Sequence, residues 1–118
     1  MNGKEKREFP RIDSKNLVSY VCLDDKGQTL SQGMGRTLNV NETGILLETI
    51  NPIDKTCVMS LAIGLKDDVI NIEGDIVHQR PGEGGWYRSG IKFHEMDDAH
   101  LTSLKIFVAA FNASISAD

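Results

Sequence analysis

The chain has 118 residues, of which 40% are hydrophobic and 25% are charged, and these values predict one folded domain with a single core. Its net charge of −4 disfavours binding to long nucleic acids through their phosphates. The longest apolar run, 106–111, is far shorter than the ~20 residues of a membrane-spanning helix, and residues 1–6 lead into no signal-peptide core. We therefore expect a cytoplasmic protein without membrane insertion.

The N-terminal segment is basic. Lys4, Lys6, Arg7 and Arg11 lie close together, so positive charge is concentrated at this end of an acidic chain. Pro10 lacks a backbone donor and disfavours helix at the residue before it, so the segment is expected to be extended or turned. Arg7 and Arg11 would then project to the same side, up to ~13 Å apart, where their guanidinium groups could hold phosphates or a guanine edge. The alternative is a solvated tail.

Six segments after this tail are rich in β-forming residues or alternate apolar with polar residues. They cover 16–23, 28–40, 45–48, 56–65, 69–80 and 86–93, and turn-forming sequences separate them. Short strands at this spacing predict a closed or nearly closed antiparallel β-barrel. Within the fifth segment, Gly74 is expected to mark a bulge or a bend at a barrel corner.

The C-terminal segment changes to a helical period. Asp97 and Asp98 suit the N-terminal cap and first turn of a helix. The apolar residues that follow recur at steps of three and four: Leu101, Leu104, Val108, Phe111 and Ile115. Four further apolar residues fall outside this stripe: Ile106, Phe107, Ala109 and Ala110. The helix is therefore predicted either to cap a barrel mouth or to present a dimer face.

Neither a metal site nor a catalytic site is predicted. Cys22 and Cys57 lack C-x-x-C spacing and are interpreted as small apolar strand residues, with a disulfide as the alternative. The histidines, His78, His94 and His100, are scattered. The serines and threonine considered have no evident histidine partner in a recognisable motif: Ser19, Ser31, Ser60, Ser89 and Thr43. The paired aspartates suit turns and caps. We expect no enzyme, no metal and no cofactor.

A second polar motif lies at the end of the second predicted strand. Asn39 and Asn41 flank one strand residue and would therefore point the same way. Each amide offers paired donors and an acceptor, as recognition of a guanine edge requires. The alternative is an Asx-type turn, in which Gly44 supplies backbone freedom.

Together, these features resemble the signature of the PilZ domain family, which is R-x-x-x-R in an N-terminal segment followed by [D/N]-x-S-x-x-G within a β-barrel. Arg7 and Arg11 match the first part, and Asn39 and Gly44 match the second. Asn41 stands where the family signature has Ser. Asn has a longer side chain than Ser and could shift a bound base. The resemblance extends over most of the chain.

The segment 87–93 also resembles a late strand of the family that carries a G-x-x-F element, here Gly90 and Phe93. The resemblance implies a mostly β fold, a six-stranded antiparallel barrel with a C-terminal α-helix and a flexible N-terminal arginine segment. The corresponding parts of this single domain are a ligand-clamp segment at 1–14, the barrel at 15–96 and the helix at 97–116.

The function that the resemblance implies is that of a bacterial second-messenger receptor, whose outer barrel face binds cyclic di-GMP. Arg7 and Arg11 would contact phosphate and guanine, and Asn39 would bind a guanine edge. The other expected ligand-binding residues are Lys6, Asn41, Gly44 and Gly90. Whether the ligand binds as one molecule or as a stacked pair stays open.

Ordering of the arginine segment around the ligand would create a surface for a downstream protein partner. The receptor would be a monomer or a homodimer. The alternative function is a PilZ-like adaptor that binds no nucleotide and acts through protein–protein contacts, and Asn41 is the feature that favours it. DNA or RNA binding is not expected, because the chain is acidic and has few aromatic residues.

Overall fold

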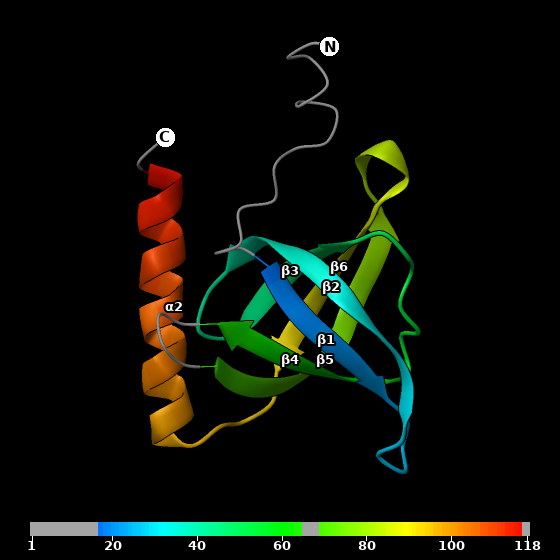
Figure 1. Cartoon of the computed structure of the whole chain (residues 1–118), viewed down its shortest axis with the longest axis horizontal. Coiled ribbons are helices and arrows are strands. Elements are labelled where there is room, and N and C mark those ends of the chain that lie inside the picture. Colours follow the sequence, from blue (N-terminus) through cyan, green and yellow to red (C-terminus); the bar gives the residue numbers. More distant parts are fainter. Residues whose placement is uncertain (1–16, 65–68, 117–118) are drawn as a thin grey trace.

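The computed structural model describes residues 17–64 and 69–116, and these residues form a closed barrel of six antiparallel strands followed by one α-helix (Figure 1). The strands are β1 (Leu17–Leu23), β2 (Thr29–Val40), β3 (Gly44–Thr49), β4 (Val58–Gly64), β5 (Val69–Pro81) and β6 (Tyr87–Phe93). Their spatial order is β1-β2-β3-β6-β5-β4, and pairing of β1 with β4 closes the barrel. The predicted fold is confirmed for this part of the chain.

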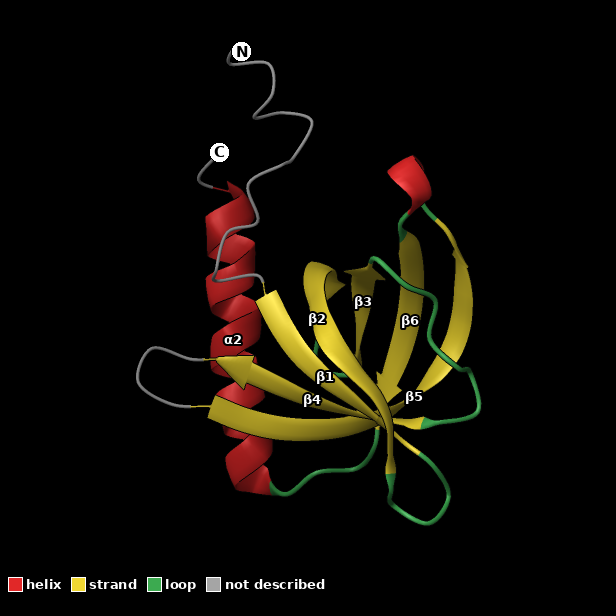
Figure 2. Cartoon of the chain, turned by 45° about the vertical axis from the view of Figure 1, so that its right-hand side comes forward, coloured by secondary structure: helices red, strands yellow, loops and turns green. Residues whose placement is uncertain are grey.

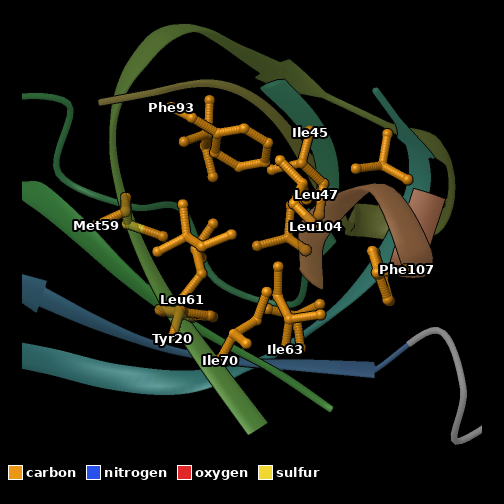
Figure 3. Close-up of a cluster of buried hydrophobic side chains, with 14 of the residues drawn as sticks. Tyr20, Ile45, Leu47, Met59, Leu61, Ile63, Ile70, Phe93, Leu104 and Phe107 are labelled. Atoms are coloured by element: carbon orange, nitrogen blue, oxygen red, sulfur yellow. The ribbon is translucent and has the colours of Figure 1, made fainter. Parts of the chain in front are cut away.

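The barrel core follows from the two-residue period of its strands. Alternate residues point inward, so β1 buries Val18, Tyr20 and Cys22, whereas its other residues are partly or fully exposed. Three residues of β4 are buried in the same way: Met59, Leu61 and Ile63. Figure 3 shows Tyr20, Met59, Leu61 and Ile63 together with side chains of β3 and the helix inside the barrel. One continuous hydrophobic core results.

Helix α2 (Asp98–Ser116) lies across one end of the barrel, beside the start of β1 and the end of β4 (Figure 2). Its first turn is capped by Asp97, whose Oδ1 accepts a hydrogen bond from the backbone N–H of His100 at 2.8 Å. This bond, and then the bond to the His100 ring, hold the pKa of Asp97 below its usual range. The predicted cap is confirmed.

One part of the helix prediction is wrong. Phe107, which the predicted stripe left outside, is only 4% exposed, whereas Ile106 is 57% exposed. The core-facing stripe contains Leu104, Phe107, Val108 and Phe111, which follow the i, i+3, i+4, i+7 pattern of one helix face. The buried face of this helix is therefore wider than the predicted apolar stripe, because the helix covers a barrel mouth.

Of the two alternatives predicted at Gly74, a bulge or a bend, the bulge is not observed there. Gly74 pairs in regular register with Phe93, and the register of β5 against β6 shifts only between Ile76 and His78, which leaves Val77 as the extra residue. Glycine is required at position 74 for a different reason, since a Cβ there would lie 2.6 Å from the carbonyl oxygen of Lys92. The bulge itself lies further along β5.

The two cysteines are free thiols, and both are buried. Cys22 lies in β1, as predicted, but Cys57 lies in the turn before β4 and is therefore not a strand residue. Burial and, next, a hydrogen bond with the Cys22 thiol raise the pKa of Cys57 to about 12. Thiolate is the reactive form of cysteine, so this thiol is protected in the folded protein.

We expect DTNB at about pH 8 to label Cys57 on the order of a thousand times more slowly than an unhindered cysteine, because its thiolate fraction is lower by that factor. Addition of denaturant should restore fast labelling of both thiols. Because the pKa of Cys57 is raised, its thiol makes a contribution to the stability of the fold that is fully present below the ordinary thiol pKa. This contribution is lost as pH rises toward about 12. Rapid labelling of the native protein would contradict the structure.

Candidate functional site

An open hollow of about 390 Å³ lies on the outer face of β2, β3, β6 and β5, and we call it the outer hollow. The end of β2 and the turn into β3 line it with Asn39, Asn41 and Gly44. Strands β5 and β6 line it with His78, Arg80, Gly90 and Lys92. All of the predicted site residues that the structure describes, Asn39, Asn41, Gly44 and Gly90, therefore lie together in one place. Lys6, Arg7 and Arg11 lie outside the described residues.

Strand order explains why residues so far apart in the sequence meet. Strand β3 pairs with β6, not with β4, so Gly44 lies opposite Lys92 and Leu46 lies opposite Gly90. On the other edge of β6, Gly90 lies opposite His78 of β5. The outer hollow is thus a product of this non-sequential pairing.

Asn41 holds the turn between β2 and β3. Its Oδ1 accepts hydrogen bonds from the backbone N–H of Thr43 at 2.7 Å, the hydroxyl of Thr43 at 2.8 Å and the backbone N–H of Gly44 at 3.0 Å. The Asx-type turn is therefore present. Because the carbonyl oxygen is engaged inside the turn, the group that Asn41 can offer a ligand is its NH₂ donor.

Asn39 lies just after a bulge. The register of β2 against β3 shifts between Thr37 and Asn39, which leaves Leu38 as the extra residue. Asn39 and Asn41 are both exposed, and Val40 between them is buried, so the two amides lie on the same outer side as predicted. The Oδ1 of Asn39 accepts a hydrogen bond from the backbone N–H of Val40 at 2.9 Å, which orients its amide. Bulges of this kind re-aim side chains at the edge of a site.

Two glycines line the outer hollow at points where an added side chain would meet neighbouring atoms. A Cβ at Gly44 would lie 2.5 Å from the carbonyl oxygen of Ile91. At Gly90, a Cβ would overlap the imidazole of His78, whose Cε1 would be 2.7 Å away. The His78 ring thus lies against the backbone of β6, and a side chain at position 90 would displace this exposed ring, whereas at Gly44 the obstacle is backbone.

The cations of the outer hollow were not predicted. Arg80 and Lys92 line it, and no acidic residue does so among the described residues. Beside it, register places Arg36, Glu48, Arg88 and Arg80 in one row across β2, β3, β6 and β5. The alternation of side chains along β6 could have indicated these cations, because Arg88, Gly90 and Lys92 share one face of the strand.

Glu48 is the central residue of this row. It is only 6% exposed, and its Oε1 accepts a hydrogen bond from Nη2 of Arg36 at 2.7 Å. Its Oε2 lies 3.8 Å from Nε of Arg88. One buried carboxylate is therefore shared by two arginines, and the row keeps an excess of positive charge next to the outer hollow.

A second hollow of about 340 Å³ lies where β5 and β6 meet the start of α2, lined in part by Glu73, His94 and His100. Nε2 of His94, one of its lining residues, lies 2.9 Å from Oδ1 of Asp75. The described residues contain no group of three or more His, Cys, Asp or Glu side chains arranged to hold a metal ion.

Within the described part of the chain, no helix is long and apolar enough to span a membrane.

The fold and the outer hollow are typical of a small β-barrel binding module. The PilZ domain family model matches residues 5–110, which is nearly the whole chain, and the chain therefore belongs to the PilZ domain family. A search of the curated proteins found no match. PilZ domains are binding or adaptor modules and not enzymes, and the family is known to bind cyclic di-GMP.

Proposed function

We propose that this protein is a cytoplasmic receptor that binds cyclic di-GMP at the outer hollow and signals through a protein partner. The observation that carries this proposal is the convergence of Asn39, Asn41, Gly44 and Gly90 on one open, basic hollow. Asn39, Asn41 and Gly44 belong to one turn, and the pairing of β3 with β6 brings Gly90 beside them.

The charges of the outer hollow support an anionic ligand. The chain as a whole carries a net charge of −4, yet the charged residues that line the hollow are Arg80 and Lys92. A local basic site can bind a small anion in a protein whose overall charge repels long nucleic acids. The two phosphates of a cyclic dinucleotide suit this surface, because guanidinium groups bind phosphate through paired hydrogen bonds.

The remaining groups suit guanine. The amides of Asn39 and Asn41 lie side by side on the outer face, and amide donors can bind the acceptor edge of guanine. Val77, which is 59% exposed at its bulge, and Leu46 add an apolar surface on which a base can rest. Arg7 and Arg11 then close over the ligand from the N-terminal segment, by the role that the family signature implies.

Closure of that segment supplies the signal. Ordering the chain costs conformational entropy, and charge-assisted hydrogen bonds to the ligand offset this cost. The ordered segment forms a new surface beside the barrel, which a partner can distinguish from the free form.

The second candidate function is an adaptor without nucleotide binding. Asn41 in place of Ser favours it, but the hydrogen bonds of Asn41 keep the signature turn intact.

Isothermal titration of cyclic di-GMP into the wild-type protein and an Arg11→Ala variant tests the proposal, with GTP as the control ligand. We expect saturable binding of micromolar affinity or tighter to the wild type. Loss of one guanidinium bonded to a charged group should weaken binding by about 10- to 150-fold.

The matched control is Lys4→Ala, which removes a positive charge from the same segment outside the signature. It should bind nearly as tightly as the wild type. A folded wild-type protein that releases no heat with cyclic di-GMP would overturn the receptor and favour the adaptor.

A further inference from the structure

We propose that Arg80 and Lys92 bind the phosphates of the dinucleotide from the barrel side, so that the barrel itself carries half of the phosphate site. This inference rests on the proposed function and adds ligand-binding residues that lie outside the family signature. Arg80 lies on β5 and Lys92 lies on β6, and both line the outer hollow.

The bulge at Val77 is what brings Arg80 to the outer face. Before it, Ile70 and Ile72 of β5 point inward, and a one-residue insertion moves every later side chain to the opposite face. His78 and Arg80 therefore face outward, whereas Gln79 is only partly exposed. Without the extra residue, Arg80 would point toward the barrel interior.

Gln79 anchors this arrangement. Its Nε2 donates a hydrogen bond to the carbonyl oxygen of Ile53 at 2.6 Å, and its Oε1 accepts one from the backbone N–H of Ile53 at 3.1 Å. A side chain that pairs with both backbone groups of one residue holds its strand in a defined register. The outward direction of Arg80 is thus built into the fold.

Arg80 is placed unfavourably for the free protein. It lies directly opposite Arg88 across β5 and β6, and like charges in that position are destabilising. Arg88 lies near Glu48, but Arg80 has no ion-pair partner in the described part of the chain. Lys92 also has no ion-pair partner among the described residues, although Asp75, which is paired with His94, lies opposite it on β5. A bound anion in the outer hollow would offset the repulsion between Arg80 and Arg88. An arginine with a purely structural role would be expected to lie beside an acidic partner.

The spacing of the two cations suits a ligand with two phosphates. Arg80 lies level with Arg88 on β6, and Lys92 is four residues further along that strand, which corresponds to ~13 Å. Gly90 lies between the two levels, where the exposed imidazole of His78 lies against the backbone of β6. Two long, flexible cationic side chains can therefore lean over the hollow from its two ends.

Titration of cyclic di-GMP into Arg80→Gln and Lys92→Gln tests this inference against the wild type. We expect each variant to bind about 10-fold more weakly and Arg80→Lys to recover part of the loss. The melting temperature of unliganded Arg80→Gln should be equal to that of the wild type or higher, because repulsion with Arg88 is removed. Lys105→Gln, which removes an exposed positive charge from α2, should bind like the wild type.

The outcomes separate this inference from the proposed function. Wild-type affinity in both variants overturns the inference and leaves the receptor intact. If the wild type does not bind cyclic di-GMP, the receptor proposal fails. An NMR titration with pyrophosphate then decides whether Arg80 and Lys92 form an anion site. Amide shifts at Gly90 and Lys92 that disappear in Arg80→Gln would support an anion site at this place, and unchanged amides would overturn it.

Discussion

Leu47→Ala is expected to lower the free energy of unfolding by about 3–5 kcal/mol, the range for a buried leucine whose cavity does not collapse. Leu47 has no exposed surface and lies in β3, beside Ile45 and close to Leu104 of the helix that caps the barrel (Figure 3). A closed barrel resists collapse because its strands are bonded on both sides. Urea unfolding followed by circular dichroism measures the effect.

Gly35→Ala is the companion variant that tests this explanation. In the wild type, a Cβ at Gly35 would lie 2.7 Å from Cγ of Leu47, so the substitution alone should be destabilising. After Leu47→Ala that clash is absent, and the new methyl group fills part of the cavity. Gly35→Ala should therefore cost less in the Leu47→Ala protein than in the wild type. Strictly additive effects would show that the two residues do not share this space.

Gly44→Ala is expected to weaken cyclic di-GMP binding by at least about 10-fold and to destabilise the fold by about 1–3 kcal/mol. The new Cβ would lie 2.5 Å from the carbonyl oxygen of Ile91, and this is backbone that cannot rotate away. Strands β3 and β6 must separate where they line the outer hollow. Calorimetric titration and thermal unfolding measure the two effects.

The control for this prediction is Gly64→Ala at the end of β4. A Cβ at Gly64 would meet nothing within 4 Å, so both the affinity and the melting temperature should stay near their wild-type values. Gly44→Ala protein that is folded and binds the ligand with wild-type affinity would show that the close approach of β3 and β6 does not shape the site.

The sequence alone was sufficient for the elements and for part of the site. The predicted strand at 86–93 is observed as Tyr87–Phe93, and the cap predicted at Asp97 precedes the helix Asp98–Ser116. These features depend on side-chain periods and capping bonds that act within a few residues, so they are visible in the local sequence. The turn that presents Asn39 and Gly44 was visible for the same reason, whereas their role in ligand binding was predicted from the resemblance to the PilZ signature.

Only the tertiary structure decided which faces these elements share. The bulge at Val77 moves Arg80 to the outer face, and pairing of β3 with β6 brings Gly44 opposite Lys92. The link between Arg36, Glu48 and Arg88 likewise exists only across paired strands. Register is set by the neighbouring strand, and a shift of one residue exchanges the two faces, so a local sequence pattern does not contain it. The sequence therefore determined the strands, the helix and the signature turn, whereas barrel closure determined the basic surface around them.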